Sequence, residues 1–386
     1  MTNFEVANLV TLSKQHHLLF RRQNNSLKIK MEKVINLGIP HVGELIFESF
    51  DTPELLQCLL VSETWKVLAE NVLIKRWKGK MLEASKSGET KVVQLLLERC
   101  NSEESGLNVK DEYESTALMW ACCNGHKNVV ELLLDHSERI DLNARNNGGL
   151  TAFIYACLDG HKDVVKLLLN HPITENELNA RNNNGDTAFI MACYKGHKDV
   201  VQFLLDHIDR GIEVNARTNS ETAFTLACQE GHTDVVQLFL EHSERNIDLN
   251  ARNIDGETAF SKACRIGHKY VVQLLLDNTD IELNSRDNDG ETAFMLACRY
   301  AQKDVVKLLL DYADRDIDLN AKDDGGRTAF QMACSRGHKD VVQLLLNYHP
   351  EHVDIDVSEW ILISAEIKYL IDMHFSILTM DLFTMS

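Results

Sequence analysis

The pattern of hydrophobic and polar residues in this chain repeats every 34 to 36 residues over most of its length. Each copy opens with the string Thr-Ala-(Leu/Phe)-x-x-Ala-Cys, and the seven copies start at Thr116, Thr151, Thr187, Thr222, Thr258, Thr292 and Thr328. In six copies Gly-His follows. Every copy then carries Val-Val-x-(Leu/Phe)-(Leu/Phe)-Leu, whose apolar residues have helical spacing. A turn rich in Asn, Asp and Gly completes the unit.

Each unit therefore predicts two short helices. In the first copy these run from Thr116 to about Asn124 and from Lys127 to Asp135. The threonine is a suitable N-cap, and Gly125 supplies the left-handed residue that ends the first helix. Neither helix can bury its apolar face alone. Stacking of successive copies makes one continuous core, so the pattern predicts an all-α solenoid of helix–turn–helix units with hairpin turns.

These strings resemble the ankyrin repeat, whose pattern is Thr-Pro-Leu-His-x-Ala-Ala, Gly-His, Val-Val-x-Leu-Leu-Leu and a Val-Asn ending. The resemblance covers residues 80–357, as one partial copy and seven further copies. Three departures from the pattern matter. Ala301-Gln302 replaces Gly-His and Ser220 replaces a turn glycine, so local weak points are expected there. Two or three extra residues precede the turn asparagine of each copy, which predicts longer loops.

The turn asparagines of the copies, such as Asn215 and Asn250, allow two interpretations. A turn asparagine commonly makes local hydrogen bonds. The resemblance adds the possibility of hydroxylation, since ankyrin repeats are common targets of an asparaginyl hydroxylase.

Residues 37–79 predict three short helices with more apolar surface than a unit of this size can bury by itself. The segment resembles an F-box, so the preferred fold is a small three-helix F-box in front of the ankyrin solenoid. That resemblance implies docking to a Skp-type adaptor and a cullin. The positions that match are Pro40, Ile46, Phe47, Leu55, Val61 and Trp65. The pattern does not separate core residues from contact residues. The alternative is an unusual N-terminal cap of the solenoid.

Both ends of the chain depart from the repeat pattern. Residues 1–36 are expected to be a flexible basic leader, because the first 31 residues carry five Lys and Arg against one acid, Glu5. An organelle presequence has the same composition, and Met31 is an alternative start. Residues 358–386 are apolar at roughly helical spacing. They predict a C-terminal capping helix, or alternatively a docking helix for another protein.

Charge and composition exclude several classes of protein. The chain has 386 residues and a formal charge of −18, and residues 81–386 carry 29 Lys and Arg against 50 Asp and Glu. Such an acidic body repels phosphate backbones, so no nucleic-acid partner is expected. Charges interrupt every long apolar stretch, which excludes a membrane span. Ten cysteines without a secretory signal predict free thiols and a cytoplasmic and/or nuclear location.

The candidate chemical groups all have structural explanations. The Gly-His histidines recur about 35 residues apart, so stacking places them in a row and not around one ion, as zinc requires. Seven cysteines share one slot, where a small buried residue is expected. Phosphate-binding loops and hydrolase motifs do not occur in the sequence. The sequence therefore predicts no catalytic residue, no metal, no cofactor and no enzyme.

Target binding is expected on the concave groove of the solenoid, where the residues after the repeated cysteine vary between copies. The candidate residues are Tyr194, Lys195, Arg265, Ile266, Arg299, Tyr300, Arg327 and Arg336. Because Arg and Tyr dominate many interfaces, the arginines beside Tyr300 suggest a target with an acidic or phosphorylated segment. The alternative is that each arginine pairs with a neighbouring carboxylate such as Glu257 or Glu291.

Together the two resemblances imply the substrate-recognition subunit of an SCF-type ubiquitin ligase. In this hypothesis the F-box docks the adaptor and the ankyrin groove binds an unknown target protein. The mechanism would be effective concentration, without chemistry by this chain. The alternative function is an ankyrin scaffold or inhibitor with no role in ubiquitination, and an enzyme is a distant third.

Overall fold

The computed structural model describes residues 47–48, 50, 52, 55, 58–59, 63–99, 106–171, 178–218, 220–348 and 364–384. The predicted leader, residues 1–36, lies outside these ranges. Contacts divide the chain into two compact units, and the boundary falls between Asn147 and Gly148. Across the described ranges the fold is helical, apart from an isolated bridge between Arg217 and Thr222.

The described part of unit 1 includes one long helix and, after it, two helix pairs. The helices are α5 (Glu63–Trp77), α6 (Met81–Lys86), α7 (Thr90–Arg99), α9 (Ala117–Cys123) and α10 (Lys127–Leu134). Helix α5 packs on α7, and α6 packs on α9. An ion pair of 3.1 Å between Arg99 Nη2 and the buried Glu70 Oε2 ties α7 to α5. The segment before the repeats is thus joined to the first helix pair.

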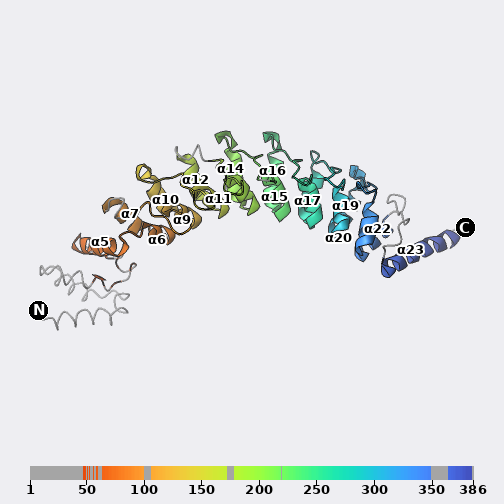
Figure 1. Cartoon of the computed structure of the whole chain (residues 1–386), viewed down its shortest axis with the longest axis horizontal. Coiled ribbons are helices and arrows are strands. Elements are labelled where there is room, and N and C mark those ends of the chain that lie inside the picture. Colours follow the sequence, from red (N-terminus) through yellow and green to blue (C-terminus); the bar gives the residue numbers. More distant parts are fainter. Residues whose placement is uncertain are drawn as a thin grey trace, which may run out of the picture. The chain divides into compact units, whose positions relative to one another are not determined.

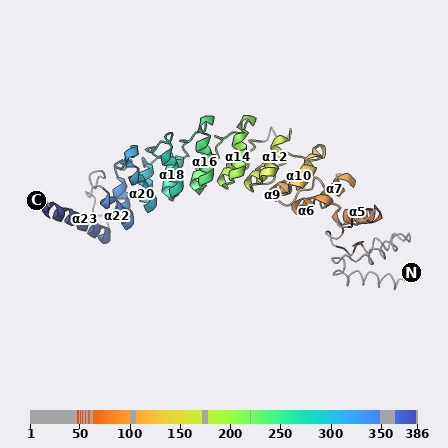
Figure 2. The same cartoon turned by 180° about the vertical axis from the view of Figure 1, so that it is seen from behind.

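Unit 2 is a row of six helix pairs followed by one long helix (Figures 1 and 2). The first helices are α11 (Ala152–Leu158), α13 (Ala188–Tyr194), α15 (Ala223–Glu230), α17 (Ala259–Ile266), α19 (Ala293–Arg299) and α21 (Ala329–Arg336). The second helices are α12 (Lys162–Asn170), α14 (Lys198–Asp206), α16 (Thr233–Glu241), α18 (Lys269–Asp277), α20 (Lys303–Asp311) and α22 (Lys339–Asn347). First helices contact first helices and second helices contact second helices, which gives two layers.

The helix ends follow the expected local chemistry. In all seven copies the threonine before the first helix is its N-cap, and its side chain accepts a hydrogen bond from the third helical N–H. The Gly-His glycines adopt positive φ, as Gly196 does at 72°. A Cβ on Gly196 would lie 2.5 Å from His232 Nδ1 of the next copy, so glycine is needed for space as well as for conformation.

The copy with Ala301-Gln302 keeps the architecture despite its sequence. Ala301 takes the left-handed conformation with φ of 59°, where a Cβ costs roughly 1–2 kcal/mol relative to the right-handed form. Gln302 Nε2 donates a hydrogen bond of 2.8 Å to the carbonyl of Arg265, the same kind of bond that histidine makes in other copies. The expected weak point is therefore confined to the strained alanine.

In four copies the extra residues before the turn asparagine do not form the simple longer loops that the sequence suggested. They form 3₁₀ turns at Ser137–Arg139, Ile208–Arg210, Ser243–Arg245 and Ala313–Arg315. In unit 2, Arg245 Nη1 donates a hydrogen bond of 2.7 Å to the carbonyl of Leu205, which lies at the end of the second helix of the preceding copy. The inserted arginine thus satisfies a helix-end carbonyl, which favours an ordered turn.

The turn asparagines clamp neighbouring copies together. Asn215 Nδ2 donates a hydrogen bond of 2.7 Å to the carbonyl of Asn246, and Asn215 Oδ1 accepts one of 3.0 Å from the backbone N–H of Asp248. Asn179, Asn250 and Asn284 make the same pair of bonds to the copies that follow them. The sequence led us to expect hydrogen bonds within one turn, but the side chains of these asparagines bond to the following copy.

We expect Asn215→Ala to lower the free energy of unfolding by about 1–3 kcal/mol, because two hydrogen bonds between copies disappear. Chemical denaturation followed by circular dichroism measures this. Asn184→Ala is the matched control, since Asn184 is an exposed asparagine in a hairpin turn of the same unit. Equal stability of the two variants would show that the clamp contributes nothing.

The repeated cysteines lie in the core of the helix layers. Cys157, Cys193, Cys228, Cys264, Cys298 and Cys334 are all buried and free. Burial disfavours the thiolate and raises the pKa of these thiols, to about 12 for Cys334 and further for the others. These thiols are therefore packing groups, as small buried cysteines generally are.

We expect a thiol reagent at pH 8 to modify the partly exposed Cys123 rapidly and the six core cysteines of unit 2 only on unfolding. A Cys100→Ser background removes the cysteine that lies outside the described residues. Peptide mass spectrometry against labelling time, with and without denaturant, gives the rates. Fast labelling of Cys228 in the native protein would contradict the packing described above.

The C-terminal helix α23 (Ala365–Thr384) packs on α22. Ile367 and Ile371 are fully buried, and Lys339 of α22 forms an ion pair with Glu366. The first turns of α23 thus cover the end of the last helix pair, which is the arrangement that a capping helix requires.

Candidate protein-binding surface

Each first helix of unit 2 presents only a few residues outward. Counting from the capping threonine, the residues at positions 1, 2, 3, 5 and 6 are buried, with the exception of the partly exposed Gln331. Positions 4 and 7 lie one helical turn apart on the same side of the helix. Position 7 is at least partly exposed in every copy, whereas position 4 is partly exposed over α11, α13 and α15 and buried over α17, α19 and α21. The pairs are Tyr155 and Leu158, Met191 and Tyr194, Leu226 and Gln229, Lys262 and Arg265, Leu296 and Arg299, and Met332 and Ser335. These pairs, with the residue just before each threonine, are called the first-helix face below.

The histidines after each first helix hold this face in place. His232 Nε2 donates a hydrogen bond of 2.9 Å to the carbonyl of Tyr194, and His268 Nε2 donates one of 2.7 Å to the carbonyl of Gln229. His197 and His338 make the same bond to Leu158 and Arg299. Each bond reaches position 7 of the preceding first helix, so the backbone under the outward residues is fixed by the next copy.

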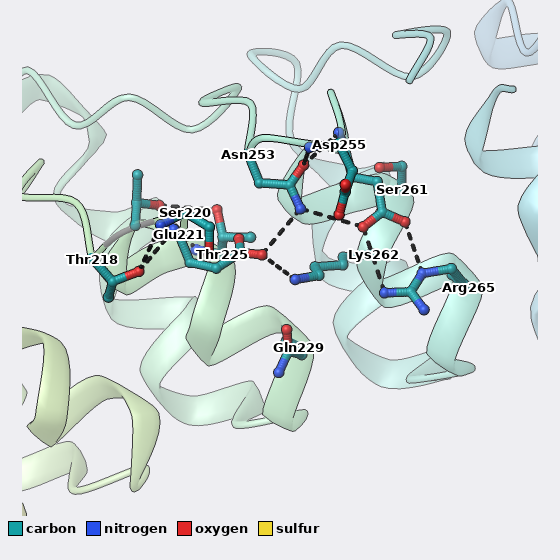
Figure 3. Close-up of polar contacts among 12 residues, drawn as sticks. Thr218, Ser220, Glu221, Thr225, Gln229, Asn253, Asp255, Ser261, Lys262 and Arg265 are labelled. Atoms are coloured by element: carbon teal, nitrogen blue, oxygen red, sulfur yellow. Dashed lines mark hydrogen bonds and ion pairs between the residues drawn. The ribbon is translucent and has the colours of Figure 1, made fainter. Parts of the chain in front are cut away.

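A network of buried charges joins α15 and α17 (Figure 3). Lys262 Nζ donates to Glu221 Oε1, and the two side chains are only 8% and 9% exposed. Asn253 Nδ2 donates 3.0 Å to the same Glu221 oxygen and lies 3.4 Å from Glu257 Oε2. Arg265 Nε is 2.7 Å from Glu257 Oε1. Side chains of opposite charge thus join the two copies, and the amide of Asn253 lies between the carboxylates of Glu221 and Glu257.

The next copy repeats the arginine–glutamate pair beside an exposed aromatic ring. Arg299 donates to Glu291, which is 1% exposed, and this hydrogen bond raises the pKa of the guanidinium. The guanidinium carbons of Arg265 and Arg299 lie 5.7 and 5.8 Å from the ring centroid of Tyr300. Because Tyr300 is 47% exposed, two anchored arginines and an open tyrosine ring share one place on the surface.

The other predicted target-binding residues lie on or beside the same face. Lys195 Nζ is 5.0 Å from the ring centroid of Tyr194, and Ile266 is 37% exposed. Arg327 pairs with Asp323 at 2.7 Å, and Arg336 is exposed. The pairing alternative thus describes the contacts of Arg265, Arg299 and Arg327. Whether these arginines also bind a target stays a prediction.

The predicted adaptor-binding residues divide into two groups. Pro40, Ile46 and Val61 lie outside the described residues. Phe47, Leu55 and Trp65 are at most 1% exposed, and the rings of Phe47 and Trp65 meet edge to face with centroids 5.5 Å apart. These three side chains are therefore buried in unit 1, a distinction that the sequence did not provide.

Sequence reasoning missed the residues at position 4, which include the partly exposed Tyr155 and Met191 and the buried Lys262. The signal was available, because Lys262 is the only charged residue at that position in the seven copies. Its partner Glu221 precedes it by 41 residues, a separation that no helical period indicates.

Comparison with protein families accounts for the repeating part of the chain. A model of three ankyrin repeats matches residues 81–180, 173–253, 210–287 and 243–323, and a model of many ankyrin repeats matches residues 302–346. These matches cover more than half of the chain. The chain belongs to the ankyrin-repeat family. The matches begin at residue 81, so they give no support to the F-box interpretation of residues 37–79.

Other comparisons add little to this family assignment. A search among curated proteins found no match. Within the described ranges, no ankyrin helix combines the length and apolarity that crossing a membrane requires. In that same part of the array, no three His, Cys, Asp or Glu residues are placed to hold a metal ion. Ankyrin arrays are protein-interaction modules, so the first-helix face is the natural place to seek a protein partner.

Proposed function

We propose that this chain is an ankyrin scaffold that binds a partner protein through the first-helix face of unit 2 and performs no chemistry itself. The observation that carries the proposal is the combination of a fixed backbone with varied outward residues. Histidines and asparagines fix the copies, while the residues at positions 4 and 7 change from Tyr155 and Leu158 to the buried Lys262 and the partly exposed Arg265. Rigid support of variable side chains is what specific recognition requires. Free buried thiols fit a reducing cytoplasmic or nuclear compartment.

Site-specific photo-cross-linking in the cells that produce the protein tests this function. A photoreactive amino acid is placed at Tyr194 on the first-helix face or at Tyr300, which follows Arg299 of that face. The control positions are Lys166 and Lys307, which are exposed on the second helices α12 and α20. We expect a discrete protein adduct from the face positions alone. Equal adducts from all four positions, or adducts from the control positions only, would refute the proposal.

The F-box interpretation is the second candidate function. It is supported by the packing of Phe47 against Trp65 and by the complete burial of Leu55, so that three residues of the pattern are buried in unit 1. In this proposal unit 1 docks a Skp-type adaptor and cullin, and the array holds the substrate of the ubiquitin ligase.

Co-purification with a purified Skp-type adaptor separates the two functions. The F-box interpretation expects the wild-type chain to retain the adaptor. The variant Leu55→Ala/Trp65→Ala should lose it, while circular dichroism shows that the repeats are still folded. If the wild-type chain does not retain the adaptor, or if the double variant binds it equally well, the F-box interpretation is wrong.

A further inference from the structure

The first-helix face changes its chemistry along unit 2. Over α11, α13 and α15 the outward residues are mostly apolar and all are at least partly exposed, with Tyr194 at 36%. These residues are called the apolar strip and comprise Leu150, Tyr155, Leu158, Met191, Tyr194 and Leu226. Partly exposed large side chains that lie in a row favour contact with a partner over contact with water.

Over α17 and α19 the exposed position 7 carries a cation, and Lys262 lies buried at position 4 of α17. The arginine cluster comprises Arg265, Arg299 and Tyr300, and both guanidinium groups lie near the Tyr300 ring. Glu257 and Glu291 hold the two guanidinium groups by ion pairs, and both glutamates are buried. A guanidinium has five N–H donors, and one carboxylate cannot use all of them. The cluster thus offers fixed donors beside an exposed ring.

We propose that the first-helix face binds one extended segment of the partner, with bulky apolar side chains at one end and Asp or Glu side chains at the other. This inference rests on the proposed function and adds the chemistry of the partner. The apolar end would lie on the apolar strip, where burial is favourable. The carboxylates would accept hydrogen bonds from the arginine cluster, which places cations on an otherwise acidic chain. Gln229 and Lys262 mark the change between the two halves.

The helix spacing sets the length of this segment. Neighbouring packed helices lie roughly 8–10 Å apart, so the four steps from α11 to α19 span roughly 32–40 Å. An extended chain advances about 3.3 Å per residue. The segment therefore needs roughly 10–12 residues between its outermost contacts.

Fluorescence anisotropy with synthetic peptides tests the proposal on the full chain. The probe has about 14 residues, with Leu and Trp in one half and Glu in the other, to match the length derived above. Both block orders are made, because the direction of the partner chain is not fixed. A peptide of the same composition with the residue types alternating is the control. We expect one block order to bind about tenfold tighter than the control, which is about 1.4 kcal/mol.

Two variants assign the halves of the peptide to the halves of the face. Met191→Ser/Tyr194→Ser should weaken binding at least about fivefold, since two large contacts disappear, and leave the salt dependence unchanged. Arg299→Gln/Glu291→Gln removes a cation without leaving a buried carboxylate unpaired. It should weaken binding and also reduce its salt dependence. Tyr270→Ser and Lys166→Gln, on exposed positions of α18 and α12, should change nothing.

The inference is overturned if the block peptides bind no better than the alternating peptide, or if the strip variant leaves binding unchanged. This failure is distinguishable from failure of the proposed function. Cross-links from Tyr194 or Tyr300 to a partner, together with failed peptides, would leave the protein-binding role in place and remove the two-part segment. Cross-links found equally at the control positions would remove the role itself.

Discussion

Replacing Lys262 by Met should lower the free energy of unfolding of unit 2 by about 3–5 kcal/mol, because it leaves a buried carboxylate without its cation. Glu221 is 9% exposed and takes its charged partner from the next copy. Methionine itself fits this position, since Met191 and Met332 occupy it in other copies. The loss would therefore come from the stranded charge and not from poor packing. Urea unfolding followed by circular dichroism measures it.

A second variant separates the charge effect from packing. In Lys262→Met/Glu221→Leu both charges are gone, and leucine stands in the equivalent slot at Leu150. We expect most of the lost stability to return, because replacing a buried ion pair by apolar groups is often neutral or stabilising. Lys269→Met is the control at an exposed lysine of α18. If the single and double variants are equally unstable, the ion pair is not what Lys262 contributes.

Replacing Phe239 by Ala should lower the free energy of unfolding by about 3–5 kcal/mol through the cavity it creates. Phe239 is fully buried, and its ring centroid lies 5.3 Å from that of Phe224 and 5.8 Å from that of Phe189. Stability in a repeat array depends on contacts between neighbours, so a large local loss can uncouple the copies on either side. We expect calorimetry to show two unfolding transitions of unit 2 in place of one.

Phe239→Leu is the matched control for this cavity. Leucine occupies the equivalent position in other copies, as Leu204 and Leu275 do, and both are buried. The loss should then be within about 1.5 kcal/mol, because the volume is largely kept. A Phe239→Ala variant as stable as Phe239→Leu would show that the three rings do not form a tightly packed cluster.

Much of the fold was predictable because it depends on interactions within one copy. The threonine caps, the left-handed glycines and the two helices of each unit all follow from residues close in sequence, and the structure has them where the pattern put them. The turns were predicted less well. Arg245 orders its 3₁₀ turn by bonding the carbonyl of Leu205, which belongs to the preceding copy. The sequence of a single turn contains no information about that carbonyl.

The candidate site divides in the same way. The period alone placed Tyr194, Arg265 and Arg299 in equivalent positions and Tyr300 in the next position. It did not show that Arg265 and Arg299 both approach the ring of Tyr300, nor that Glu257 and Glu291 anchor them. The apolar strip was also missed. The exposure of Tyr155 and Met191 depends on how closely the neighbouring first helices approach them.

The sequence by itself determined the repeat period, the helix pairs and the ankyrin family, because these are properties of one unit repeated many times. Only the tertiary structure decided which outward side chains are paired, stacked or left open to a partner. The physical reason is the distance along the chain between interacting groups. Lys262 and Glu221 are 41 residues apart, yet they meet because two copies stack, and stacking brings together residues that no local pattern relates.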